Sequence, residues 1–130
     1  MSSTPGGRAG AAGPAEEGAV RELHRVLDRL AALGPGRLAR PGPRPVGAEV
    51  VSAEPARPVD VVRPLLQQLA DEAAHLEGRS RRDVPELASH ALGDQLAVLA
   101  GDVLAAARAG GDVAATGRLH QHLTRLRRAL

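Results

Sequence analysis

The sequence lacks several whole classes of side chain. Its 130 residues include no Phe, Tyr, Trp or Cys, and also no Ile, Asn or Lys. Without cysteine the chain can form no disulfide, no thiolate nucleophile and no cysteine-based zinc site. Without aromatic residues it lacks the side chains that normally bury the largest areas, about 150–250 Å² each. Most of the missing types have A/T-rich codons, which indicates a G+C-rich coding source. Together these absences exclude most motifs on which enzyme chemistry depends.

The apolar residues that remain are almost all Ala, Leu and Val, and they favour a helical fold. Ala lets helices approach one another closely, whereas the strand-forming residues other than Val and Thr are absent. A buried Leu contributes roughly 1.5–3 kcal/mol, so stability must come from many leucines in register. We therefore predict an all-α fold, a small helical bundle.

The charge is nearly balanced. Seventeen arginines against fifteen acidic residues give a formal net charge of +2. The isoelectric point of 10.8 is high because every base is Arg, which stays protonated. A nucleic-acid-binding surface over the whole protein is therefore not supported. The most apolar stretch, residues 96–107, is interrupted by Asp102 and is shorter than the roughly 18 residues of a membrane span. Residues 1–13 have no apolar signal region, and we expect a cytoplasmic protein without membrane contact.

Composition divides the chain into four segments. Residues 1–14, rich in Ser, Gly, Ala and Pro, are predicted to be a disordered tail. Residues 15–34 carry apolar residues at helical spacing and are predicted to be an amphipathic helix. Residues 35–58 contain six prolines and are predicted to be a Pro/Gly/Arg-rich linker. Residues 59–130 are predicted to form the bundle domain.

Three helices are predicted in the last segment. The first begins at Asp60 and ends at Gly78, the second is capped by Asp83, and the third is capped by Asp112. Because the joints between them look short, we expect three antiparallel helices. The helix over 15–33 either docks on them as a fourth member or binds something else.

Gly93, Ala97 and Gly101 form a stripe of small residues on one predicted helix. A glycine inside a helix costs about 1 kcal/mol relative to alanine, so another helix is expected to pack closely there. We favour a neighbouring helix of the same chain. The alternative is the same helix of a second copy.

The histidines give only a weak signal for metal. Glu72 and His75 have the Glu-x-x-His spacing of di-iron bundles, but the second such motif that those sites need is missing. His75 is predicted instead to be exposed and paired with Asp71, four residues earlier. We predict no catalytic residue, no metal and no bound cofactor, and hence a protein that is not an enzyme.

The predicted function is that of a non-catalytic helical protein–protein interaction or adaptor protein. The first helix, tethered by the linker, is expected to lay its apolar stripe into a groove, on a protein partner or on another copy of the chain. The predicted partner-binding residues are Val20, Leu23, Leu27 and Leu30. Burial of these residues in the bundle would remove the basis of this hypothesis.

The alternative is a nucleic-acid-associated regulator. Residues 113–130 contain four arginines and no acidic residue. These possible phosphate contacts are Arg118, Arg125, Arg127 and Arg128. The absence of aromatic residues that stack on bases counts against this alternative. Basic residues in a last helical turn also complement the helix dipole, which needs no ligand.

Overall fold

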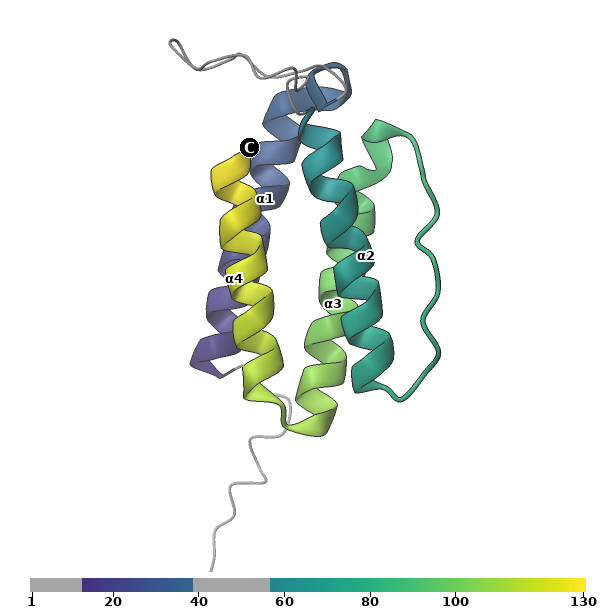
Figure 1. Cartoon of the computed structure of the whole chain (residues 1–130). Coiled ribbons are helices and arrows are strands. Elements are labelled where there is room, and N and C mark those ends of the chain that lie inside the picture. The colour runs from purple at the N-terminus through teal and green to yellow at the C-terminus, as the bar shows by residue number, and fades with distance from the viewer. Residues whose placement is uncertain (1–12, 39–56) are drawn as a thin grey trace, which may run out of the picture.

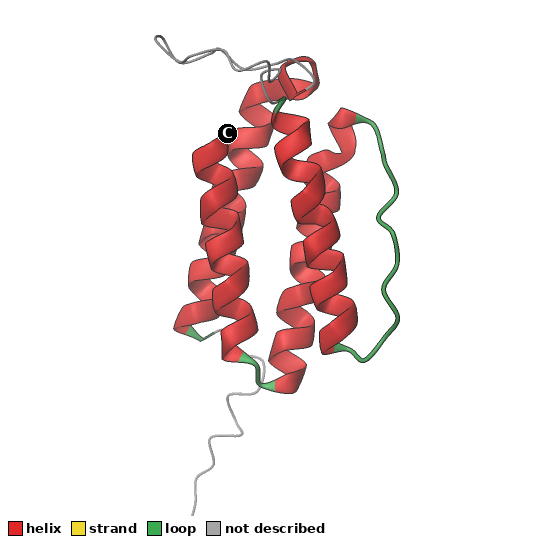
Figure 2. Cartoon of the chain, viewed as in Figure 1, coloured by secondary structure: helices red, strands yellow, loops and turns green. Residues whose placement is uncertain are grey.

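The computed structural model describes residues 13–38 and 57–130, which fold into four packed helices without a strand among them (Figures 1 and 2). The helices are α1 (Pro14–Leu38), α2 (Pro58–Leu76), α3 (Leu92–Gly110) and α4 (Val113–Ala129), and the short 3₁₀ helix η2 (Ser89–Ala91) leads into α3. The predicted all-α bundle is confirmed. Most of the predicted tail and linker lies outside the described residues. None of the described helices combines the length and the apolar content needed to cross a membrane.

Local sequence explains where several helices begin and end. The Asp112 side chain accepts a hydrogen bond from the backbone N–H of Ala115 at 3.0 Å, so it caps α4 as predicted. Gly111, after α3, has a φ of 65°, which glycine adopts without strain. Gly34, with a φ of 73°, interrupts α1 near its predicted end. Pro58 lies in the first turn of α2, where a missing N–H costs least.

In the view of Figure 1 the helices run up, down, down and up. The tight turn at 111–112 makes α3 and α4 antiparallel, as predicted. The expected antiparallel arrangement of α2 and α3 is wrong, because these two helices lie side by side and run parallel. Residues 77–88, which join them, return along the whole length of α2.

The side chain of Gln67 explains how this return segment is held. Its amide nitrogen donates to the carbonyl of Arg82 at 3.0 Å, and its amide oxygen accepts from the N–H of Val84 at 2.9 Å. Val84 precedes Pro85, and a residue before proline disfavours helical geometry. Asp83 is therefore not a helix cap, and α3 begins only at Leu92. In place of the expected short joint, residues 77–88 form an extended segment whose backbone is hydrogen-bonded by Gln67 of α2.

The core lies along the bundle axis and is built by all four helices. Its fully buried leucines are Leu66, Leu69, Leu92, Leu96, Leu119 and Leu123. From α1, Ala19 and Val26 are completely buried in the same cluster. The most extensive packing occurs within two pairs of helices, α1 with α4 and α2 with α3. The helix predicted over 15–33 therefore docks as a fourth member of the bundle.

Candidate functional site

The residues predicted to bind a partner do not form an exposed stripe. Leu23 and Leu30 are only 8% and 3% exposed and belong to the core. Val20 and Leu27 are half-buried. The expectation that this stripe is free is wrong, because α3 and α4 cover it. Leu27 and Leu30 still line a hollow of about 340 Å³ between α1 and α3.

The four arginines predicted to contact phosphate fall into two groups. Arg118 donates to the carboxylate of Glu72 at 3.0 and 2.6 Å, and Arg127 forms an ion pair with Glu22. Arg125 and Arg128 are exposed, and neither forms an ion pair with any described residue. Half of the predicted cationic cluster is therefore neutralised by carboxylates of neighbouring helices.

Glu22 is a buried acid that the sequence analysis missed. It is 3% exposed, and its carboxylate accepts hydrogen bonds from Arg127 and, at 3.1 Å, from the Thr124 hydroxyl. The hydrogen bond from Arg127 lowers the pKa of Glu22, while burial opposes this shift. In the sequence a single Glu on an amphipathic helix carries no sign that it is buried. The pair joins α1 to α4.

An apolar groove lies between α3 and residues 82–87, and we call it the loop groove. It has a volume of about 550 Å³. Its apolar lining comes from Ala70, Val84, Pro85, Leu87, Ala91, Val98 and Leu99. Leu87 is 44% exposed and Val98 is 62% exposed, which is high for such side chains. Contiguous exposed apolar surface of this kind marks interaction sites more often than isolated apolar residues do.

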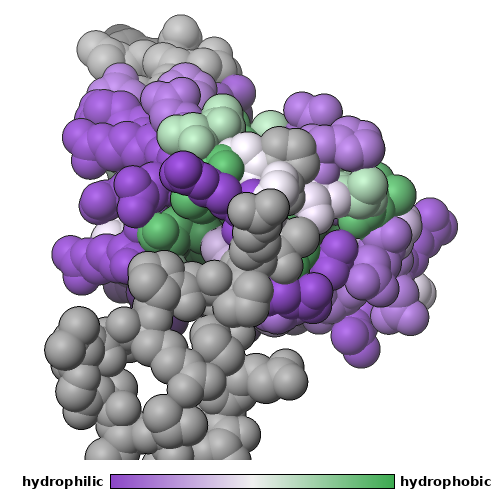
Figure 3. All heavy atoms as spheres, turned by 90° about the horizontal axis from the view of Figure 1, so that it is seen from above, coloured by the Kyte–Doolittle hydropathy of each residue, from purple (hydrophilic) through white to green (hydrophobic). Residues whose placement is uncertain are grey.

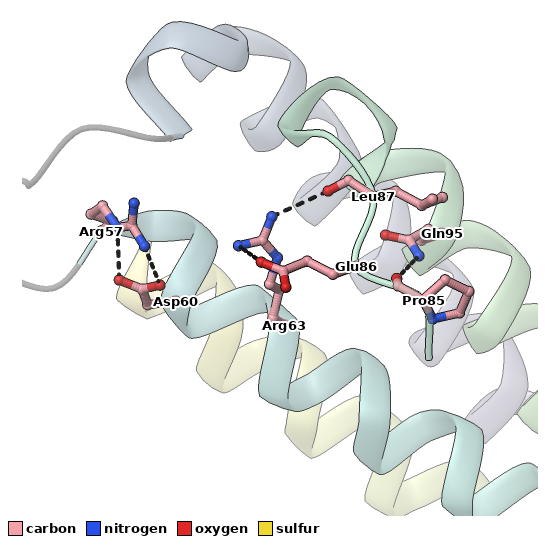
Figure 4. Close-up of polar contacts among 7 residues, drawn as sticks. All are labelled: Arg57, Asp60, Arg63, Pro85, Glu86, Leu87 and Gln95. Carbon is pink, nitrogen blue, oxygen red and sulfur yellow. Dashed lines mark hydrogen bonds and ion pairs between the residues drawn. The ribbon is translucent and has the colours of Figure 1, made fainter. Parts of the chain in front are cut away.

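Polar contacts fix the outer wall of the loop groove, as Figure 4 shows. Gln95 of α3 donates to the carbonyl of Pro85 at 3.0 Å. Arg63 of α2 donates to the carbonyl of Leu87 at 3.1 Å and forms an ion pair with Glu86 at 3.2 Å. The wall is thus bonded from both helices, and a groove already fixed in place loses less conformational entropy on binding.

The outer face of α3 is the second part of this surface. Asp94, Val98, Gly101, Ala105 and Arg108 follow one another at helical spacing, and all five are exposed. Seen from above, hydrophobic residues of the molecule reach the surface in patches among hydrophilic ones (Figure 3). Together with the loop groove, this face forms a largely apolar surface with Asp94 and Arg108 near its ends and the exposed Asp102 between Val98 and Ala105 on its flank.

The stripe of small residues meets a neighbouring helix at Gly93 but not at Gly101. A Cβ built on Gly101 would meet no heavy atom of residues 13–38 or 57–130 within 4 Å outside its own helix. A Cβ on Gly93 would meet only the side chain of Leu27, at an ordinary contact distance of 3.9 Å. The expectation that the stripe serves packing within the chain is therefore wrong at Gly101.

Glu72 and His75 of α2 lie near a second histidine, His122 of α4. Both line a hollow of about 380 Å³ between α2 and α4, together with His122. Burial is the main cause that lowers the pKa of His122. The expected ion pair of His75 with Asp71 is not formed, and Asp71 bonds Arg81 at 2.9 Å instead. No group of three residues within 13–38 and 57–130 is arranged to hold a metal ion.

Comparison of the chain with protein-family models, with curated proteins and with solved structures finds no match in any of the three. A bundle of helices hosts many unrelated functions, so fold alone does not assign one. The feature of this molecule that bears on function is the exposed apolar surface around α3.

Proposed function

We propose that this chain is a non-catalytic helical protein–protein interaction protein whose binding surface surrounds α3. The surface consists of the loop groove and the outer face of α3, and we call it the α3 face. The observation that carries the proposal is the exposure of Val98, at 62%, beside a groove whose wall is fixed by hydrogen bonds. Nothing in the packing of the bundle requires a large apolar side chain there.

The occupant that fits the α3 face is the apolar stripe of another helix. The loop groove runs from Ala91, at the end of η2, along α3 past Gln95 and Val98, and these three residues are about one helical turn apart. Small residues at 97, 101 and 105 let a second backbone approach closely, and helix-in-groove recognition uses side chains at this spacing. The charged residues Arg82 and Asp83 are exposed beside the groove. Charged residues at the rim of an apolar patch are typical of protein interfaces.

Site-specific photo-crosslinking in the source cells tests this proposal. A photoreactive residue at position 98 should capture a protein, whereas one at position 113 should not. Val113 is the matched control, because it is 69% exposed on α4 and lies outside the α3 face. With the captured protein purified, Val98→Arg should weaken binding at least about tenfold, or 1.4 kcal/mol, and Val113→Arg should not. Equal capture at both positions contradicts the proposal.

Nucleic-acid binding remains a second proposal with narrower support. It relies on Arg125 and Arg128, the two exposed arginines of α4 that form no ion pair among the described residues. Binding to duplex would have to fall steeply as salt is raised. If the chain does not shift duplex DNA in a gel at low salt, this alternative fails.

A further inference from the structure

We infer that the α3 face binds a second copy of this chain, with the two α3 helices antiparallel about a two-fold axis at Gly101. This inference rests on the proposed function, because it names the occupant of one part of the same surface, the outer face of α3. It follows from the order of residues along the face, from the charges at its two ends and from the absence of any packing reason for Gly101 among the described residues.

The order of residues along the α3 face is self-complementary. Asp94 and Arg108 lie seven residues before and after Gly101, so each is about 10.5 Å from it along the helix. The two-fold axis therefore brings Asp94 of one copy level with Arg108 of the other. Val98 and Ala105 share the flank next to the loop groove, and the axis places them opposite each other.

The other flank of α3 follows the same rule. Ala97 lines the hollow between α1 and α3, and Leu104 follows it seven residues later on the same flank. The two-fold axis sets Ala97 opposite Leu104 of the second copy. On both flanks a larger side chain thus meets an alanine, while glycine meets glycine at the axis. This alternation of large and small residues allows two helices to interlock.

Asp94 and Arg108, at the two ends of the face, favour the antiparallel arrangement, although the exposed Asp102 then lies on the same flank in both copies. Asp94 forms no ion pair with any described residue. Arg108 donates to Glu16 through Nε and Nη2, at 2.7 to 3.0 Å, and its Nη1 has no bond to another described residue. Nη1 is therefore available to a carboxylate of the second copy. In a parallel arrangement Asp94 would face Asp94 and Arg108 would face Arg108, which is unfavourable.

Gly101 supports the same conclusion from backbone energetics. Glycine inside a helix is disfavoured relative to alanine, because it loses more conformational freedom on folding. No side chain or backbone of another helix lies close enough to require a glycine at 101. A facing helix at the two-fold axis supplies such a requirement, since the two backbones come closest there.

The absence of cysteine makes a direct test possible, because single-cysteine variants of the full chain report on one position each. Under mild oxidation, Gly101→Cys should form a disulfide-linked dimer about tenfold faster than the control, because only residues with Cα atoms about 4.4–6.8 Å apart can be bridged. Ala114→Cys is the control, an exposed position on α4 outside the α3 face. A mixture of Val98→Cys and Ala105→Cys should cross-link faster than either variant alone.

The outcomes separate this inference from the proposed function. If Gly101→Cys cross-links no faster than Ala114→Cys, and the Val98→Cys and Ala105→Cys mixture shows no preference, the inference is wrong. Circular dichroism of each variant checks that the helices are intact. If photo-crosslinking at position 98 then captures a different protein, the proposed function stands without the second copy. If position 98 captures nothing, both fail.

Discussion

At the scale of single residues, leucine carries the stability that aromatic residues carry in most proteins. The core is filled by many medium-sized side chains that form one buried cluster. No one residue dominates, so the structure depends on how many leucines lie in register. Glu22 is the exception, a buried carboxylate between α1 and α4 that is bonded by Thr124 and by the partly exposed Arg127.

The first prediction concerns the core. Leu96→Ala and Leu123→Ala should each lower the free energy of unfolding by about 2–5 kcal/mol, because both leucines are completely buried and their removal leaves a cavity. Val113→Ala, at an exposed position, should change it by less than about 0.5 kcal/mol. Urea denaturation followed by far-UV circular dichroism measures all three. Equal effects of the buried and exposed substitutions would contradict the assignment of the core.

The second prediction concerns pH. Folding lowers the pKa of His122 below 6.5, so on acidification this histidine is protonated in the unfolded chain before it is protonated in the folded one. Stability therefore falls as the pH drops below 6.5. Folding also lowers the pKa of Glu22 below 4.5, so its contribution is present above pH 4.5 and is lost as the pH falls through the folded-state pKa. Stability should therefore decline in two stages on acidification.

Denaturant midpoints measured across this pH range test the two stages. His122→Gln should make the unfolding free energy depend less steeply on pH below 6.5, and Glu22→Gln should do the same below pH 4.5. The slope is the informative quantity, because Glu22→Gln also weakens the contact with Arg127 at every pH. If the unfolding free energy instead rises as the pH is lowered from 7 to 4.5, the predicted direction of the pH dependence is wrong.

At the scale of elements, the return segment over 77–88 shapes the molecule most. It sets α2 and α3 parallel and supplies one wall of the loop groove. It contains no helix or strand before η2, so its position depends on side chains of the two flanking helices. The bonds from Gln67, Arg63 and Gln95 are therefore expected to control whether the groove exists.

The third prediction tests that control. Gln67→Ala removes the bonds to the carbonyl of Arg82 and the N–H of Val84, so residues 82–88 should exchange their amide hydrogens faster while the helices stay protected. The loss of stability should be about 1–3 kcal/mol. Gln68→Ala is the matched control, since Gln68 is the exposed neighbour. Equal exchange in the two variants would contradict the role of Gln67.

The elements also show how far the sequence could be interpreted. Apolar spacing and capping residues predicted the helices and the cap at Asp112, because those signals are local. The parallel direction of α2 and α3 was missed, because it depends on Gln67 bonding a backbone more than a dozen residues away. The candidate site was missed for the same reason. The α1 stripe looked free until the structure showed α3 and α4 covering it.

At the scale of the whole molecule, α1 completes the bundle rather than extending from it. It packs most closely on α4, and Arg29 donates to the carbonyl of Leu130 at 3.0 Å, so the first and last helices support each other. The proposed binding surface lies on the other helix pair, where the outer face of α3 is exposed.

The fourth prediction follows from this arrangement. Removal of residues 1–38 should abolish cooperative unfolding, because it uncovers apolar residues of α3 and α4 and leaves Arg127 without Glu22. Removal of residues 1–12 should leave the melt unchanged. Thermal melts by circular dichroism make the comparison. A chain without residues 1–38 that melts like the full chain would mean that α1 is dispensable to the fold.

Sedimentation equilibrium of the intact chain tests the central claim most directly, with absorbance of the peptide bond for detection because the chain has no aromatic residue. The claim is that the α3 face binds a second copy. The average mass should rise with concentration from 13.4 kDa toward twice that value, and Val98→Arg should hold it at 13.4 kDa. A wild-type chain that stays at 13.4 kDa at every concentration, indistinguishable from Val98→Arg, would contradict it.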